Sequence, residues 1–559
     1  MEINYIKQSN NKLFETLNNL LDYHSIQNYI PIYKHFFTMK EETYNIFNLN
    51  HTIHIKSFID KISLNKYVVK GSDKKKRELF IKFSPIIDPI KFMCGKINES
   101  ELLKLPSILD SQSDKINRYN NSSYVDGMFS YLSSLLLNNY GFYNGIDFYG
   151  TFLGIKNNFE FNITDDIEYL NQSEHYLENL NKTFFVDHKI QDQLLYNISF
   201  KNKKKLKISE NKELLSFDEF NDEFYDDIFK KQPSGENQSL QVVYKGQLHK
   251  KSSSTASSSC SSRISFTSSS EDENDLDCNS QCSDDEECCD DEECCNSDYE
   301  SDNSNYSTDS IFNENIFAKI KKFPVQIILM ESLQDTLDNY MESDDFKFYQ
   351  LKPIILQILI VLATYQKAYS FTHNDLHSSN IMYNKTDIPY LYYKINNKYY
   401  RIPTYGKIFK IIDFGRSIYS CKKKHITNDS YYKDGDAYSQ YNYAEFYNKN
   451  KMEIKPNYSF DLCRLSCSLY DAIIHNDELD IVKLILSWSI DVHGKNVLYK
   501  LNGEERYPEF KLYKMISRNV KDKIPISQIS NKIFNCYIVK EKPKNFFDLD
   551  AIPKSPDFA

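Results

Sequence analysis

HNDLHSSN at residues 373–380 and DFG at residues 413–415 are the two stretches that decide the fold of this 559-residue chain. Residues 381–383 continue the first stretch as a short apolar strand, and residues 408–412 lead into the second as another. An isolated Asp is more often a turn residue or a helix cap than a reactive group. The two stretches together, in this order and each beside an apolar strand, therefore predict one shared site.

The two stretches match the patterns H-x-D-L-x-x-x-N and D-F-G, and in this the chain resembles the protein-kinase superfamily. The resemblance implies that Asp375 accepts the proton of a substrate hydroxyl as that hydroxyl attacks the γ-phosphate of ATP. It also implies that Asn380 and Asp413 hold the two Mg²⁺ ions, so ATP and Mg²⁺ are the expected cofactors. Gly415, which ends the second motif, is expected to be structural.

Position 377 is a His where serine/threonine kinases usually carry the Lys that contacts the γ-phosphate. A His occurs at the matching place in haspin-like kinases and in several small-molecule phosphotransferases and related ATPases. It can donate a hydrogen bond, and whether it is charged depends on its pKa. We expect His377, together with His373 at the start of the motif, to belong to the catalytic group.

The region where a kinase carries its glycine-rich loop contains no glycine. Residues 54–70 alternate like one or two strands, and the first glycine after His51 is Gly71, which is followed by a basic run at 74–77. The backbone-amide cradle that usually covers the phosphates is therefore missing or rebuilt.

Residues 78–83 read as a strand that ends in a lysine, like the V-A-I-K strand of kinases. The resemblance implies that Lys82 pairs with the α- and β-phosphates, and a surface lysine on a strand is the alternative. Apolar residues at helical spacing over 125–136 fit the helix whose glutamate pairs with this lysine. The only acid there is Asp126, which either substitutes for that glutamate or is an exposed acid in the first helical turn.

Residues 145–156 and 158–163 are predicted to be two further strands of the same sheet. Residues 323–331 read as a buried strand that runs into an acid, and the resemblance places adenine against the backbone near Glu331 to Leu333. The apolar stripe at 354–365 predicts the central helix of the second lobe. Its apolar run of about 12 residues is too short to span a bilayer.

Residues 390–395 and 398–402 predict a β-hairpin inserted between the two motifs. About 45 polar, Tyr-rich residues follow Gly415, which is compatible with a long activation segment, although no Ala-Pro-Glu is present. Asp461 then begins a helix that resembles the kinase helix whose aspartate braces the backbone of the catalytic loop. A helix cap is the alternative role for Asp461, and the two roles are compatible.

The expected fold is α+β: a two-lobed protein-kinase-like fold with a small antiparallel sheet lobe, a larger helical lobe and a long, partly disordered insertion. The predicted boundaries are an N-terminal helical extension at 1–48, the first lobe at 49–165, the insertion at 166–310, the last strand of that lobe and the hinge at 311–345, and the second lobe at 346–559. Within the insertion, residues 251–310 are Ser-rich, acidic and Cys-rich, a composition that predicts disorder.

Among kinases, the chain most resembles the serine/threonine kinases assigned to giant amoebal DNA viruses. The stretches that carry this likeness are 80–89, 122–132, 373–382, 403–416 and 456–465. The likeness covers roughly residues 50–165 and 320–540 and leaves the insertion unexplained. It implies an intracellular protein, in the host cytoplasm or the virion.

The net charge of −10 is concentrated in one segment. Residues 271–302 hold 16 acids and no base, which leaves 62 acidic and 68 basic residues elsewhere, with no stripe that demands nucleic acid. Seven of the 12 cysteines lie between Cys260 and Cys295, without the spacing of a disulfide framework. With no secretory leader and no membrane span, we expect a soluble protein whose partner is a protein substrate and not a nucleic acid or a membrane.

Three functions remain open. The first is phosphorylation of a protein Ser or Thr with Asp375 as the catalytic aspartate. The second is a pseudokinase, a scaffold that binds partners without turnover, which the missing glycine loop favours and the intact Asn380 and Asp413 oppose. The third is a small-molecule phosphotransferase, which His377 suggests and the long segment after the second motif opposes.

Overall fold

The computed structural model describes residues 3–98, 100, 103–109, 115–186 and 316–555. These residues belong to one compact unit. Most of the predicted insertion, including the segment 251–310, lies outside the described residues.

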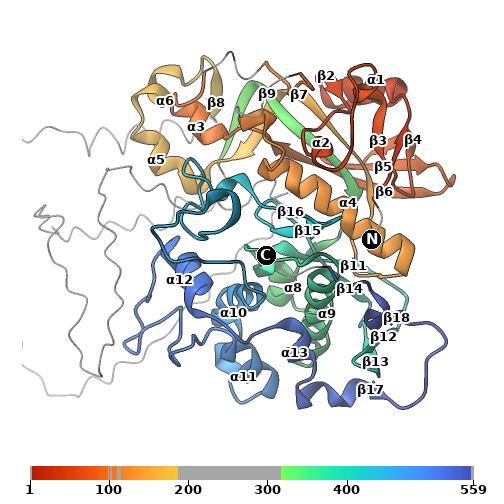
Figure 1. The fold of residues 1–559 in the computed structure, drawn as a ribbon, viewed down its shortest axis with the longest axis vertical. Coiled ribbons are helices and arrows are strands. Elements are labelled where there is room, and N and C mark those ends of the chain that lie inside the picture. The colour runs from red at the N-terminus through yellow and green to blue at the C-terminus, as the bar shows by residue number, and fades with distance from the viewer. Residues whose placement is uncertain (1–2, 99, 101–102, 110–114, 187–315, 556–559) are drawn as a thin grey trace, which may run out of the picture. The chain divides into compact units, whose positions relative to one another are not determined.

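A seven-stranded sheet organises the first part of the described chain (Figure 1). Its strands run in the order β2-β7-β9-β6-β5-β4, with β8 also paired to β9, and all neighbours are antiparallel. The bounds are β2 Tyr23–Gln27, β4 Ile55–Lys61, β5 Lys66–Gly71, β6 Lys76–Pro85, β7 Phe148–Asn162, β8 Phe184–Val186 and β9 Phe317–Glu331. The apolar run at 323–330 is buried, as expected for a central strand.

Helix α4, Ser122–Tyr140, packs against β7 and β9 (Figure 1). The side chain of Asn121 accepts a hydrogen bond from Ser123 N at its start, and Gly141 ends it with φ +71°. The helix comes close to the sheet at Gly127, where an added Cβ would lie 2.1 Å from Gln326 Nε2. This close packing turns the neighbouring Asp126 inward.

The remaining described residues combine helices with short strands and irregular segments. The α-helices are α8 Leu337–Glu342, α9 Leu351–Tyr369, α10 Phe460–Ile473, α11 Asp480–Ser487, α12 Lys511–Asn519 and α13 Pro525–Ile529. Among the described helices, one segment, Phe348–Tyr369, is long and apolar enough to cross a membrane, and 83% of its most apolar window is buried inside the fold. The prediction of a buried core helix at 354–365 is therefore confirmed.

Short antiparallel strands carry the two motifs. β11, Ile381–Lys385, pairs with β14, Lys407–Ile411, and follows the 3-10 turn η7, Ser378–Asn380. The predicted hairpin between the motifs is confirmed as β12, Tyr390–Ile395, and β13, Lys398–Pro403. The described chain thus has a mixed α and β structure with antiparallel sheets.

Two predictions about the sheet need correction. The N-terminal 48 residues are not purely helical: besides α1, Asn11–Leu21, and α2, Ile32–Phe36, they contain β2, whose Tyr23 is buried and pairs with Lys156 of β7. This pairing depends on a strand about 130 residues away, which local periodicity cannot reveal. The two strands predicted at 145–163 form the single strand β7, with Asn158 at φ +49° where the break was expected.

The beginning of the predicted insertion is part of the fold. Helices α5, Ile167–Asn171, and α6, Glu174–Asn179, lead to β8, which pairs with residues 318–320 of β9. Tyr176 and Phe184 stack with their ring centroids 5.4 Å apart as these elements pack together. The folded region therefore continues at least about 20 residues past the predicted start of the insertion at 166.

Candidate active site

Asp461, near the start of α10, holds the backbone of the HNDLHSSN loop. Its Oδ2 accepts a hydrogen bond from His373 N and its Oδ1 accepts one from Asn374 N, both at 2.9 Å. Asp461 is fully buried, and burial raises the pKa of its carboxyl. The residue that caps α10 is Ser459, so Asp461 is engaged by the loop and does not cap the helix.

The two motifs are bonded directly to each other. His373 Nε2 lies 2.9 Å from Ile412 O, and Ile412 N donates to Asn380 O at 3.0 Å. Asp375 N donates to His373 Nδ1 at 3.3 Å, so the proton of this imidazole is on Nε2, where Ile412 O accepts it. These bonds bring Asp413, the next residue after Ile412, to the loop that carries Asp375 and Asn380.

Lys82 of β6 forms an ion-pair cluster with two aspartates. Its Nζ lies 2.7 Å from Asp126 Oδ2 and 2.9 Å from Asp413 Oδ1. Asp126 is 1% exposed and its Oδ1 accepts a hydrogen bond from Phe414 N at 2.9 Å. The interpretation of Asp126 as an exposed first-turn acid is therefore wrong, and so is that of Lys82 as a surface lysine.

Burial and pairing act against each other in this cluster. Burial alone lowers the pKa of the Lys82 ammonium, but the carboxylates of Asp126 and Asp413 outweigh it, so the pKa is raised. Burial raises the pKa of Asp126, and Lys82 only partly opposes this. For Asp413 the pairing with Lys82 prevails over burial and the pKa is lowered. Lys82 is thus charged, and Asp413 is the more acidic of its two partners.

Asp375 is buried and is held by side chains that the sequence did not point to. Its Oδ1 accepts a hydrogen bond from Tyr513 Oη at 2.7 Å, and its Oδ2 lies 4.0 Å from Arg416 Nε. Burial alone raises the pKa of Asp375, but the positive charges of Arg416 and Arg464 and the Tyr513 hydrogen bond help to lower it overall. Arg416 directly follows the DFG motif and could have been suspected; Tyr513 lies 138 residues from Asp375, and no motif marks it.

His377 and Asn380 contact each other in the loop. Asn380 Nδ2 donates to Asp375 O at 2.9 Å and lies 3.0 Å from His377 Nε2. Burial lowers the pKa of His377, so the ring is neutral at pH 7 and can accept this bond. A neutral His377 does not supply the positive charge that a Lys would bring to the same position.

The expected adenine-binding residues take part in contacts within the chain. The Glu331 carboxylate accepts hydrogen bonds from Asp147 N at 2.8 Å and from Asn384, and it pairs with the Lys410 ammonium. Leu333 O accepts a hydrogen bond from Lys66 Nζ at 3.3 Å. Glu331 thereby connects the end of β9 to β14, the strand that leads to Asp413.

The β4–β5 turn at 62–65 lies in the region where the resemblance led us to expect a glycine-rich loop, and it contains no glycine. The amides of Ile62 and Ser63 both donate to Lys66 O, at 2.9 and 3.1 Å. Because these amides close the hairpin, they are not directed at a phosphate in this conformation. The exposed side chains of Ile62 and Leu64 cover the turn.

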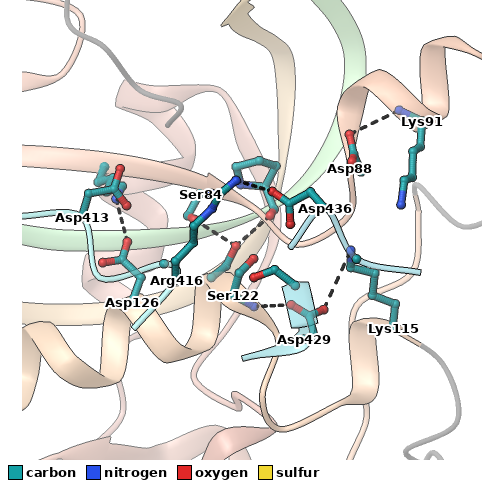
Figure 2. Close-up of a pocket in the computed structure, with 16 residues that line it drawn as sticks. Ser84, Asp88, Lys91, Lys115, Ser122, Asp126, Asp413, Arg416, Asp429 and Asp436 are labelled. Atoms are coloured by element: carbon teal, nitrogen blue, oxygen red, sulfur yellow. Dashed lines mark hydrogen bonds and ion pairs between the residues drawn. The ribbon is translucent and has the colours of Figure 1, made fainter. Parts of the chain in front are cut away.

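A polar cavity lies beside the Lys82 cluster, between the start of α4 and the segment after the DFG motif (Figure 2). Asp429 Oδ1 accepts a hydrogen bond from Ser122 N at 2.9 Å, and its Oδ2 lies 3.8 Å from Lys115 Nζ. Arg416 pairs with Asp436 at 2.7 Å. These pairs, visible in Figure 2, connect the segment after DFG to the start of α4 and to Lys115 before it, and join Arg416 to Asp436 within the segment.

The donors near Asp413 suit a magnesium ion. Among the described residues, no group of three or more His, Cys, Asp or Glu side chains could hold a metal on its own. Mg²⁺ does not need one, because it usually takes one or two protein carboxylates and completes its shell with phosphate oxygens and water. The Asp413 carboxylate and the amide oxygen of Asn380 fit this pattern, since the Asn380 nitrogen is already used as a donor.

Comparison with known proteins finds kinases along part of the chain. No protein-family profile matches. The chain is 26% identical over 220 residues, 37% of its length, to "Putative serine/threonine-protein kinase R301" of Acanthamoeba polyphaga mimivirus. It is 34% identical over 101 residues to a probable serine/threonine-protein kinase of Dictyostelium discoideum and 40% identical over 63 residues to serine/threonine-protein kinase haspin of Mus musculus.

Each similarity covers only part of this chain and only part of the related protein. The matched regions cover 50% of the viral protein and 8% of each of the other two. The predicted resemblance is confirmed at this level: the chain is similar in sequence to serine/threonine-protein kinases.

Proposed function

We propose that this chain is a two-lobed protein kinase that transfers the γ-phosphate of ATP to Ser or Thr of a protein substrate. The observation that carries the proposal is the hydrogen bonding between the two motifs through His373, Ile412 and Asn380. It supports a single site that contains Asp375, Asn380 and Asp413, and the ion pair of Lys82 with Asp413 supports the addition of Lys82 to it. Similarity to named kinases supports the same class of reaction.

Each residue of the site then has a role in the transfer. Bound Mg²⁺, held by Asp413 and Asn380, would neutralise charge on the triphosphate. Lys82 would move from its pairing with Asp413 toward the α- and β-phosphates and keep its contact with Asp126. Asp375 would orient the acceptor hydroxyl and take its proton, a contribution of about 10²–10⁴-fold in general acid–base catalysis. Most of the rate must therefore come from positioning and charge.

The test is Mg²⁺-dependent transfer from labelled ATP to protein and peptide acceptors, followed by identification of the phosphorylated amino acid. We expect phosphoserine or phosphothreonine with the wild type and at least a 100-fold loss with Asp375→Asn and with Asp413→Asn. Asp387→Asn is the matched control, because Asp387 is an exposed aspartate on the connection after β11. Transfer that survives both site substitutions contradicts the proposal.

A pseudokinase is the second candidate, and the β4–β5 turn favours it. A turn without glycine, whose amides close the hairpin, offers the phosphates little of the usual cover. If this reading holds, the purified chain binds no nucleotide or binds it without transfer to any protein, peptide or small-molecule acceptor. Calorimetric titration with Mg²⁺-ATP beside the transfer assay separates the two functions.

A further inference from the structure

Tyr513 contacts Asp375 from a helix outside both motifs, and Arg464 contacts Tyr513 from a second such helix. Arg464 lies on α10, three residues after Asp461, so the two side chains share one face of that helix. Tyr513 lies on α12, which packs against α10. One face of α10 therefore holds the backbone of the catalytic loop through Asp461 and contacts Tyr513 through Arg464. Tyr513 of α12 in turn contacts the Asp375 side chain.

The direction of the hydrogen bonds follows from the chemistry of the donors. Arg464 Nε lies 2.9 Å from Tyr513 Oη, and a guanidinium can only donate. The Tyr513 oxygen therefore accepts from Arg464, and its own proton is directed to Asp375 Oδ1, 2.7 Å away. A hydroxyl polarised by a cation is a stronger donor to a carboxylate than a free one.

The tyrosine ring is held on several sides, so its hydroxyl has a defined position. The Tyr513 and Phe510 rings stack with centroids 5.3 Å apart and planes 17° from parallel. The Arg464 and Arg416 guanidinium groups lie 5.3 and 5.7 Å from the Tyr513 ring centroid. Cation–π contacts at these distances stabilise a ring in place.

We propose that Tyr513, oriented by Arg464, is a positioning residue that fixes the Asp375 carboxylate through Oδ1, so that Oδ2 is the oxygen that meets the acceptor hydroxyl. This inference rests on the proposed kinase function. Two free rotations of an aspartate would otherwise have to be frozen when substrate binds, and fixing them beforehand favours the reactive geometry. The Arg416 side, 4.0 Å from Oδ2, is then the side that the acceptor approaches.

The test separates kcat from KM. Tyr513→Phe keeps the ring, its stacking and its cation–π contacts and removes only the hydroxyl. We expect kcat to fall about 10- to 100-fold, the range of a hydrogen bond to a charged group, while KM for ATP and for the acceptor stays within about two-fold. Arg464→Gln, which weakens the donor without removing it, should give a smaller fall in kcat. Tyr499→Phe is the matched control, because Tyr499 Oη donates to Asp471 of α10 at the surface, at 3.4 Å.

Two outcomes overturn the proposal. An unchanged kcat in Tyr513→Phe means that the hydroxyl does not position Asp375. A raised kcat means that Tyr513 occupies the place of the acceptor and blocks it.

A second measurement keeps this inference separate from the proposed function. If the wild type transfers no phosphate, the kinase proposal fails. A double-mutant cycle on thermal unfolding would still test the hydrogen bond between Tyr513 and Asp375. Tyr513→Phe and Asp375→Asn should have non-additive effects on the unfolding midpoint, whereas Tyr499→Phe and Asp375→Asn, which share no hydrogen bond, should be additive. Additive effects at Tyr513 and Asp375 contradict the contact on which the inference depends.

Discussion

The catalytic loop at 373–380 and the β4–β5 turn at 62–65 use their backbone amides in opposite ways. In the loop, the amides of His373 and Asn374 are held by Asp461, a side chain from a distant helix. In the turn, the amides of Ile62 and Ser63 bond to Lys66 O within the same hairpin. The loop is thus fixed by the fold around it, whereas the turn closes on itself.

In the proposed kinase site, the two regions would serve the two substrates differently. Asp375, on the side of the acceptor, is buried and hydrogen-bonded. The β4–β5 turn, on the side of the ATP phosphates, offers few free amides to bind them. We therefore expect transfer to be limited more by ATP affinity than by the chemical step. Four predictions test this difference, beginning with the substitution that we expect to reduce transfer most.

Asp461→Ala should have the largest effect, because it removes both hydrogen bonds to the loop and leaves two buried amides unpaired. We expect at least a 100-fold loss of kcat/KM and a decrease of about 2–6 kcal/mol in the free energy of unfolding, from about 1–3 kcal/mol for each of the two unpaired groups. Transfer assays and urea unfolding measure these effects. Asp471→Asn, an exposed aspartate on the same helix, is the control; a similar loss there would contradict the role of Asp461.

Lys82→Met should lower the free energy of unfolding more, and raise KM for ATP more, than Asp126→Asn. Without Lys82, the buried carboxylate of Asp126 and the partly buried carboxylate of Asp413 lose their shared cation, and breaking a buried pair costs up to about 3–5 kcal/mol. Asp126→Asn leaves Lys82 paired with Asp413 and keeps an acceptor for Phe414 N. Urea unfolding and the KM for ATP should both show a larger effect for Lys82→Met than for Asp126→Asn. A larger effect for Asp126→Asn would exclude Asp413 as the main partner of Lys82.

Glycine in the β4–β5 turn should strengthen ATP binding modestly. Replacing Ser63 and Leu64 by Gly allows backbone conformations with positive φ, which let amides turn toward a phosphate. We expect KM for ATP to fall about three-fold with kcat unchanged. Ser72→Gly, in the turn at the other end of β5, is the control. An unchanged KM in the turn variant would mean that the missing glycines do not limit ATP affinity.

The smallest expected effect concerns His51, whose protonation should make the free energy of unfolding depend on pH. Burial and the neighbouring His54 lower the pKa of His51 to about 3, below the usual value of 6.5. The folded state therefore favours the neutral ring, and its stabilising effect is complete above pH 6.5 and is lost as pH falls from 6.5 toward 3. The free energy of unfolding should drop by at most about 1.4 kcal/mol per pH unit from this group.

Urea unfolding between pH 7 and pH 4 measures how steeply the free energy of unfolding changes with pH. His51→Gln should flatten this dependence, and His493→Gln, which replaces an exposed His, should leave it unchanged. An equal slope in wild type and His51→Gln would show that another group causes the acid sensitivity.

The sequence predicted the elements whose signals are local. The strand with Lys82, the helix with Asp126, the hairpin between the motifs and the central apolar helix each show a clear period or turn pair, and all are present. The motifs also predicted which residues belong together, although the ion pairs of Asp126 with Lys82 became visible only in the structure.

Features that depend on distant partners were missed. Strand β2 forms through pairing with β7, and no alternation in residues 1–48 marks it. Tyr513 reaches Asp375, and Lys410 reaches Glu331, only because of how separate helices and strands pack. A Tyr or a Lys in a chain with 43 Tyr and 68 Lys and Arg residues carries no signal of such a role. These contacts are tertiary, and composition and periodicity do not encode them.

Single-turnover transfer from labelled Mg²⁺-ATP, with enzyme in excess over ATP, tests the central claim most directly. The wild type should transfer label to a protein Ser or Thr in one phase, and Asp375→Asn should bind the same ATP but transfer it at least 100-fold more slowly. Equal transfer by both proteins, or none by the wild type despite bound ATP and a broad set of acceptors, would contradict the account of one shared kinase site.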